Sequence, residues 1–127
     1  MSAIVLVEDT PQSARLAARL LRLAGHEVIV AQDGEMGLAA VMDGPPPDLV
    51  LVDLGLPDLD GQTVVALLRQ QRGLDTVPII AFTAWPQDTA HKMALAYGCD
   101  GVITKPIDTR TFASQVEAHI KRQRVQP

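Results

Sequence analysis

The sequence contains one cysteine, Cys99, and few aromatic residues. A lone cysteine cannot form an internal disulfide, and it makes a zinc site built from cysteines implausible. Aromatic residues make up 3% of the chain and hydrophobic residues 47%, so the core must consist mainly of Val, Leu, Ile and Ala. This composition is typical of a soluble α/β domain, and the cysteine content fits the reducing cytoplasm, where we expect the protein to be located.

The chain also lacks an excess of positive charge and a long hydrophobic run. Its formal net charge of -4 at pH 7 disfavours nonspecific nucleic-acid binding, because no basic stripe is present to displace counterions from phosphates. The first apolar run, residues 4–7, is too short for a signal-peptide core or a membrane span. We therefore expect no nucleic-acid partner and no membrane association.

The length of 127 residues suits one domain with its own hydrophobic core and leaves no room for a second. No internal repeat or low-complexity segment interrupts the chain. We predict one folded domain over residues 1–124, followed by a short tail at 125–127.

Short apolar, β-branched runs alternate with segments of helical period. This alternation predicts an α/β fold, with a doubly wound parallel sheet covered by helices on both faces. The predicted strands are 3–7, 26–31, 48–52, 77–82 and 101–104, and the predicted helices are about 12–24, 34–42, 62–72, 86–97 and 109–123.

Local signals indicate where several of these helices begin. Thr10 predicts a cap for the first helix, which carries Leu16, Leu20 and Leu23 at helical spacing. Capping residues for later helices are Asp33 and Asp108, Pro86 fits a first turn, and Gly98 ends the fourth helix.

Polar residues follow four of the five predicted strands: Glu8 and Asp9, Asp53, Thr83, and Lys105. The carboxyl ends of parallel strands share one edge of a sheet, and open α/β sheets bind ligands there. Clustered carboxylates raise one another's pKa unless a cation neutralises them, so the pattern indicates a hard divalent metal. A lysine and a hydroxyl opposite that metal suit a phosphoryl group.

The ordered set of motifs resembles the receiver domains of response regulators over essentially the whole chain, and specifically a single-domain member. The resemblance implies a flavodoxin-like sheet of five strands in the order 2-1-3-4-5, flanked by five helices. No single motif is specific, but their order is. The motifs are Glu8-Asp9, Asp53 with Pro57 and Asp60-Gly61, Thr83-Ala84, and Lys105-Pro106.

The resemblance also implies roles for the residues at the strand ends. Asp53 would be the phosphoryl acceptor, Thr83 the residue whose hydroxyl senses the phosphoryl group, and Lys105 the cation that neutralises it. A cis peptide bond before Pro106 would direct the lysine into the site.

By the same resemblance, the cofactor is Mg²⁺. Its ligands would be Asp9, Asp53 and the backbone carbonyl of Gly55, while Glu8 acts largely through water. Mg²⁺ suits this role because it keeps several waters and accepts few carboxylates alongside phosphate oxygens.

Three positions depart from the family or affect its chemistry. Val102 stands where receiver domains usually carry Tyr, Phe or His, and valine cannot make the inward swing of that ring. Gly55 and Trp85 stand two residues after the acceptor and the sensor, where family side chains flank the path of the hydrolytic water.

The resemblance implies a stand-alone phosphoacceptor of a two-component or phosphorelay pathway. A histidine kinase or histidine phosphotransfer protein would donate to Asp53, and the domain would turn over no metabolite, so it is not an enzyme. Because no DNA-binding or enzymatic module follows residue 124, we expect the output to be a protein interaction.

Two surfaces are expected to bind partners. The kinase would contact the first helix and the Pro106 loop. The fourth helix, fifth strand and fifth helix would bind a downstream protein or a second copy, with Ala94 and Val102 permitting close packing. The residues expected to contact the kinase on the first helix are Gln12, Ala14, Arg15 and Leu16.

Three alternative functions remain open. A flavodoxin-like binding module would need a phosphate-cradling loop where Glu8 and Asp9 repel phosphate. A phosphatase of the haloacid-dehalogenase kind would need an aspartate at Gly55. A receiver scaffold that works without phosphorylation would not need the intact set of site residues.

Overall fold

The computed structural model describes residues 2–56, 58 and 60–121, so Pro57 of the sequence motif lies outside the described residues. Strands and helices alternate along the chain. In order they are β1 (Ala3–Val7), α1 (Pro11–Leu23), β2 (Glu27–Ala31), α2 (Gly34–Met42), β3 (Leu49–Asp53), α3 (Gly61–Arg69), β4 (Ile79–Thr83), α4 (Gln87–Tyr97), β5 (Gly101–Thr104) and α5 (Phe112–Lys121).

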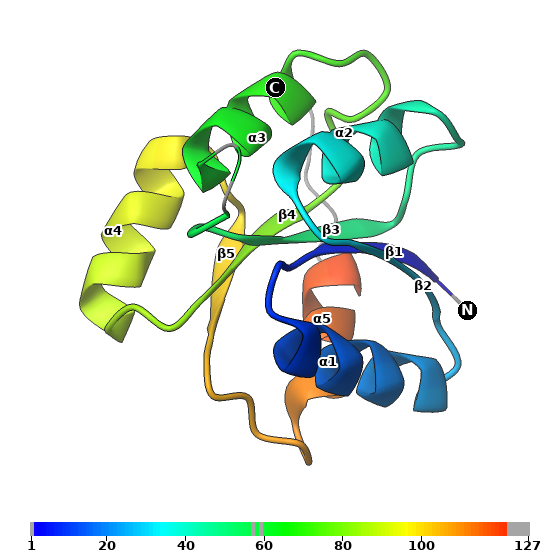
Figure 1. Ribbon diagram of the computed structural model, residues 1–127, viewed down its shortest axis with the longest axis vertical. Helices are drawn as coiled ribbons and strands as arrows, with labels where there is room; N and C mark the ends of the chain where they lie inside the picture. Colours follow the sequence, from blue (N-terminus) through cyan, green and yellow to red (C-terminus); the bar gives the residue numbers. More distant parts are fainter. Residues whose placement is uncertain (1, 57, 59, 122–127) are drawn as a thin grey trace.

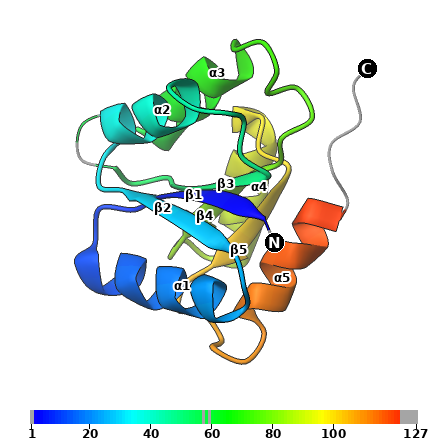
Figure 2. The same cartoon turned by 90° about the vertical axis from the view of Figure 1, so that its right-hand side faces the viewer.

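The five strands form one parallel sheet in the order β2-β1-β3-β4-β5 (Figure 1). Helices α1 and α5 cover one face, and α2, α3 and α4 cover the other (Figure 2). Both the doubly wound fold and the strand order expected from the sequence are therefore confirmed.

The core is built from aliphatic side chains on both faces of the sheet. Leu6, Leu51 and Ile80 point toward α1 and α5, and Val52 and Val65 lie in the group beneath α2, α3 and α4. Because helices shield both faces, β1, β3 and β4 are buried almost throughout. Among the helices of the described residues, none has the length and hydrophobicity needed to cross a bilayer.

Two of the three leucines noted on α1 lie outside the core. Leu16 and Leu23 are 41% and 74% exposed. The buried positions of α1 are Ala14, Ala17, Ala18 and Leu21. Small alanines allow a helix to approach the sheet closely, and that packing overrides the spacing of the larger leucines.

Several helix boundaries also differ from the sequence prediction. Within the described residues, the Thr10 side chain accepts no capping hydrogen bond from α1, and Pro86 precedes the first turn of α4. Helix α5 begins at Phe112, after a turn in which the amides of Thr111 and Phe112 donate to the carbonyl of Asp108. The predicted start near residue 109 was therefore wrong.

The start of α3 lies unusually close to the end of β3. A β-carbon on Gly61 would lie 2.6 Å from the Cα of Leu54, so only glycine fits there without a shift of the backbone. Asp60 caps the helix by accepting from the amide of Thr63 at 2.8 Å. These contacts fix the loop that follows Asp53.

Candidate functional site

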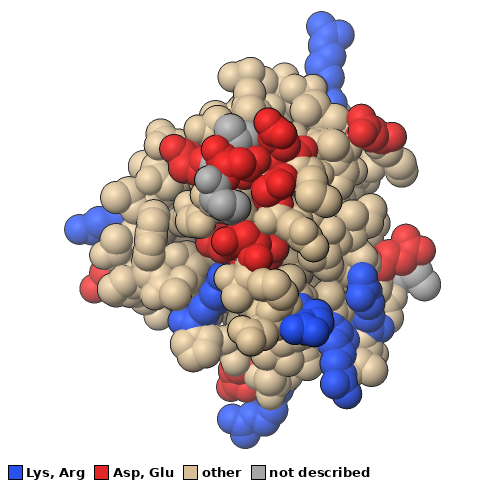
Figure 3. Space-filling model, viewed as in Figure 1, with Lys and Arg blue, Asp and Glu red and all other residues tan. Residues whose placement is uncertain are grey.

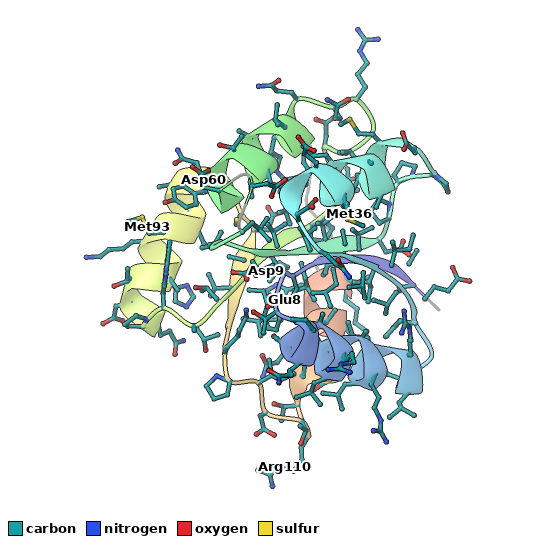
Figure 4. The ribbon with its side chains drawn as sticks, viewed as in Figure 1. Glu8, Asp9, Met36, Asp60, Met93 and Arg110 are labelled. Atoms are coloured by element: carbon teal, nitrogen blue, oxygen red, sulfur yellow. The ribbon has the colours of Figure 1, made fainter. Side chains whose placement is uncertain are left out.

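The carboxyl edge of the sheet brings together the residues singled out from the sequence. Glu8 and Asp9 follow β1, Asp53 ends β3, and Lys105 follows β5. Carboxylate oxygens of Glu8, Asp9 and Asp53 all lie within 4.8 Å of one another. Figure 4 shows Glu8 and Asp9 side by side at the entry to α1.

Lys105 lies across this acidic group. Its Nζ donates to both carboxylate oxygens of Glu8, at 3.0 and 2.8 Å, and lies 3.5 Å from Oδ2 of Asp53. The Glu8 side chain is fully buried and that of Lys105 is largely buried. The peptide bond between Lys105 and Pro106 is cis, as the resemblance implied.

Asp53 is held by its own loop while it stays accessible. Its Oδ1 accepts a hydrogen bond from the amide of Gly55 at 2.9 Å, and its side chain is 13% exposed. The carboxylate is therefore oriented by backbone on one side and faces Lys105 on the other.

Thr83 is buried, at 3% exposure, where β4 ends. Its hydroxyl oxygen accepts a hydrogen bond from the amide of Trp85 at 3.1 Å. The hydroxyl is thus linked directly to the loop that leads into α4. A displacement of the hydroxyl would therefore shift this loop.

Asp58 makes a contact that the sequence did not predict. Its carboxylate accepts from the amides of Gly34 and Glu35 at 2.8 and 3.0 Å, next to the predicted cap Asp33, which accepts from Met36. A carboxylate at a helix N-terminus is stabilising. Asp58 therefore ties the loop after Asp53 to α2, a contact between distant segments that no local pattern signals.

Three residues expected at binding surfaces are not exposed there. Ala14 is buried on the sheet-facing side of α1, and Ala94, on the sheet-facing side of α4, is 2% exposed. Val102 is partly buried and packs against the core under α2, α3 and α4. Ala94 and Val102 nevertheless line a cavity between α4, β5 and α5, so the expectation that they permit close packing on that surface stays a prediction.

Comparison with known proteins identifies the family. Residues 4–117 match the response regulator receiver domain. The chain belongs to this family. A receiver domain is a signalling module of two-component response regulators, and the convergence of acidic residues at this edge agrees with that assignment.

Individual relatives resemble this receiver domain over nearly its full length. The transcriptional regulatory protein KdpE of Mycobacterium tuberculosis is 34% identical over 122 residues, covering 96% of this chain and 52% of that protein. This chain thus spans about half the length of the curated relatives it matches.

Solved structures show the same fold. A putative response regulator from Chloroflexus aurantiacus is 28% identical with a TM-score of 0.88, covering 95% of this chain and 98% of that one. The Mn²⁺-bound form of response regulator Rcp1 is 26% identical with a TM-score of 0.75, covering 93% and 91%.

The acidic group of this receiver domain carries an excess of negative charge. Two unit charges within 4.8 Å repel by roughly 3 kcal/mol at an effective dielectric constant of about 20. Burial raises the pKa of Glu8 although its bonds to Lys105 oppose the shift, and desolvation together with Asp53 raises the pKa of Asp9. Figure 3 shows acidic side chains gathered in the middle of this face.

This donor set fits Mg²⁺. Three carboxylates face the ammonium of Lys105, and a divalent cation would offset the remaining negative charge. The oxygens are hard ligands, and Asp9 and Asp53 are both only partly buried, which suits an ion that retains several waters. Mg²⁺ would be held chiefly by Asp9 and Asp53.

Stability of the metal-free protein should depend on pH. Because the folded-state pKa values of Glu8 and Asp9 are raised, the folded protein binds more protons than the unfolded chain in the window just above the ordinary carboxyl pKa of about 4. The free energy of unfolding should therefore fall as the pH rises through that window. Thermal unfolding with and without Mg²⁺ tests this, and Mg²⁺ should restore stability at neutral pH.

Asp9→Ala should both stabilise the metal-free protein at neutral pH and weaken Mg²⁺ binding at least about tenfold, the loss that even outer partners of a metal cause. Trp85, 36% exposed beside the site, should report binding through its fluorescence. Asp60→Asn neutralises an acid that lies outside the cluster but keeps the helix cap, and it serves as the control. An unchanged Mg²⁺ titration in Asp9→Ala would show that Asp9 is no ligand.

Proposed function

We propose that this receiver domain accepts a phosphoryl group on Asp53 from a phosphohistidine of a histidine kinase or histidine phosphotransfer protein, with Mg²⁺ bound beside it. One observation carries the proposal: the Asp53 carboxylate is accessible, adjoins two further carboxylates, and lies 3.5 Å from the Lys105 ammonium. An oxygen nucleophile between a cation site and a lysine suits phosphoryl transfer.

In the proposed step, an Asp53 oxygen attacks phosphorus and the bond between phosphorus and the donor's imidazole nitrogen breaks. The imidazole leaves as the neutral base after taking up a proton from solvent, and Asp53 becomes an acyl phosphate. Lys105 stabilises charge on the phosphoryl oxygens, and Mg²⁺, when bound, supplies the remaining positive charge there. The Gly55 amide, hydrogen-bonded to Oδ1 of Asp53, orients the nucleophile.

Glu8 and Asp9 take different roles in this proposal. Both Glu8 oxygens accept from Lys105 and the side chain is buried, which supports a role through water and through Lys105. Asp9 is less buried than Glu8 and would bind the cation directly, with the Gly55 carbonyl as a further ligand. Response regulator Rcp1, which shares this fold, has been solved in a Mn²⁺-bound form, and this supports a divalent cation as a ligand of the domain.

Phosphorylation would be transmitted through Thr83. Its hydroxyl accepts from the Trp85 amide and can still donate its own proton. A new hydrogen bond from this hydroxyl to the phosphoryl group would draw the loop before α4 toward the site. Because Val102 has no ring to swing, we propose that this loop movement carries the switch.

The proposed donor would dock beside Lys105. A cavity of about 260 Å³ lies between the start of α1 and the loop after β5, and it is largely apolar. Exposed Arg15 and Leu16 flank it, and a helix bearing the phosphohistidine would fit against this face. Its lining includes Gln12, Ser13, Leu16, Phe82, Lys105 and Pro106.

The output surface in this proposal is α4, β5 and α5, for a downstream protein or a second copy. Leu95 on α4 is 76% exposed and Met93 is 38% exposed, so these residues would make apolar contacts there, and Leu95 lines the same cavity as Ala94. The domain would act in the cytoplasm.

Phosphotransfer in solution tests the proposal. The purified chain, incubated with acetyl phosphate and Mg²⁺, should gain the mass of one phosphoryl group, and EDTA should prevent the gain. Phosphorylated histidine kinases should transfer faster than the small molecule, and profiling them should name the donor. No mass gain with any donor would favour a scaffold that works without phosphorylation.

The phosphoryl group should be long-lived, from minutes to hours. Gly55 has no side chain to orient a hydrolytic water, and Trp85 offers an N–H donor but no acceptor for a proton. Gly55→Asn should accelerate hydrolysis, and the space allows it, because a β-carbon there would lie 3.7 Å from Oδ1 of Asp53. Trp85→Glu should also accelerate it.

The decay of the phosphorylated protein, followed by intact mass after removal of the donor, measures this lifetime. Met93→Glu, which adds the same charge on α4 farther along the chain, is the control for Trp85→Glu. Decay within seconds in the parent, or equal rates in all variants, would contradict the prediction.

A further inference from the structure

Phe82 is a core residue that also lies beside Asp53, the proposed acceptor. It pairs with Asp53 on one side and with Ile103 on the other. Glu8 follows Val7, the partner of Val52, so it adjoins Asp53 from β1. Residues at matching positions on neighbouring strands point to the same face, so Glu8, Asp53 and Phe82 form a row across β1, β3 and β4.

Lys105 reaches over this row. Its Nζ lies 4.8 Å from the centroid of the Phe82 ring, a distance at which the ring face attracts a cation. The same nitrogen contacts Glu8 at 2.8 Å and Asp53 at 3.5 Å. The ammonium is thus in contact with all three members of the row.

The order of the row determines what the ring does. Glu8 has two short bonds to Lys105, and these alone would draw the ammonium toward β1 and away from the acceptor. Phe82 lies on the opposite side of Asp53, on β4, so its attraction opposes that of Glu8. A flexible lysine stem, which carries much rotamer entropy, needs such opposing contacts to hold one position.

The ring itself is firmly held. Phe82 and Phe112 of α5 are both fully buried, and their ring centroids lie 5.9 Å apart at an interplanar angle of 34°. Phe112 therefore supports the ring without any contact to Lys105 that the structure records. Phe112 is therefore a matched control for Phe82, because it is the same residue type, is equally buried and belongs to the same aromatic pair.

We propose that Phe82 is a positioning residue for phosphoryl transfer: its ring face holds the Lys105 ammonium above Asp53 against the attraction of Glu8. This inference rests on the proposed function, because it assigns Lys105 to the phosphoryl oxygens. Phe82 touches no reacting atom and acts through Lys105.

Fluorinated phenylalanines at position 82 provide the test, because stepwise fluorination weakens the attraction of the ring face with little change in size. The rate constant for phosphorylation by acetyl phosphate at saturating Mg²⁺ should fall with each added fluorine, about 2- to 30-fold over the series. The Mg²⁺ dissociation constant, from Trp85 fluorescence, should not change. The same series at Phe112 should leave both quantities unchanged.

A flat series at position 82, or an equal fall at position 112, would overturn the inference. If the parent protein is phosphorylated and the series is flat, only this inference fails. If the parent gains no phosphoryl group, the proposed function fails and this inference with it.

A second measurement needs neither metal nor phosphate. In the NMR spectrum of the metal-free protein, the ring current of Phe82 should shift the Lys105 methylene protons nearest the nitrogen upfield. Phe82→Leu should abolish that shift and Phe112→Leu should retain it. Lys105 resonances that are the same in the parent and in Phe82→Leu would overturn the placement of the ammonium.

Discussion

Asp53→Asn is expected to abolish phosphorylation by acetyl phosphate and by any histidine kinase. The variant keeps the shape of the side chain and an oxygen that can accept from the Gly55 amide, but it loses the anionic nucleophile. It also removes one of three mutually repelling carboxylates, so the metal-free variant should unfold at a higher temperature than the parent. Intact mass and thermal unfolding measure the two effects.

Asp60→Asn is the matched control, because it makes the same chemical change in the same loop. Asp60 is exposed and caps α3, and Asn caps a helix about as well as Asp. This variant should be phosphorylated at the parental rate. Full phosphorylation of Asp53→Asn would show that another carboxylate is the acceptor.

Lys105→Met should slow phosphoryl transfer about 10²- to 10³-fold, the loss that follows removal of one donor to a developing oxyanion. Lys105 lies 3.5 Å from the acceptor oxygen, and methionine keeps the length of the stem without the charge. The single-turnover rate constant at saturating Mg²⁺ measures the effect. Lys92→Met, on the exposed side of α4, should have no effect.

The stability of Lys105→Met needs a separate control, because Glu8 would remain buried without its cation. Removing one partner of a buried pair is far more costly than removing both. Adding Glu8→Gln should therefore recover much of the lost stability without restoring the transfer rate. Recovery of the rate in that double variant would show that Lys105 serves only to neutralise Glu8.

The strand ends were the most predictable part of this protein. β-branched runs identify β1, β3 and β4 because strands covered on both faces are apolar throughout, and the first polar residue after each run marks the carboxyl edge. The sequence alone therefore places Glu8, Asp53 and Thr83 on one edge. The parallel topology then required them to converge.

Side-chain packing was less predictable. The spacing of the leucines indicates that α1 is a helix, but it does not show that the buried face of α1 consists mainly of alanines. The distance between helix and sheet is set by the tertiary fold and not by the helix. The same reason places Ala94 in the core. A turn precedes Phe112, in which the Asp108 carbonyl accepts from the amides of Thr111 and Phe112, and a capping signal alone does not reveal how many residues such a turn takes.

The remaining features of the site that the sequence did not predict are contacts between distant segments. Lys105 and Glu8 are 97 residues apart in sequence, so their ion pair follows only from the folded edge. In the sequence, Phe82 is indistinguishable from the other apolar residues of its strand. Its contact with Lys105 follows only from the folded edge. Asp58 likewise resembles an ordinary turn residue in the sequence, and its hydrogen bond from the Gly34 amide follows only from the folded position of α2.

Chemical trapping of the phosphorylated residue tests the central claim most directly. Borohydride reduces an acyl phosphate to an alcohol, so a phosphorylated aspartate becomes homoserine and its position can be read by peptide mass spectrometry. After incubation with acetyl phosphate and Mg²⁺, homoserine should appear at position 53 and be absent from samples treated with EDTA. Homoserine at position 9, 58 or 60 in place of 53 would contradict the assignment of Asp53 as the acceptor.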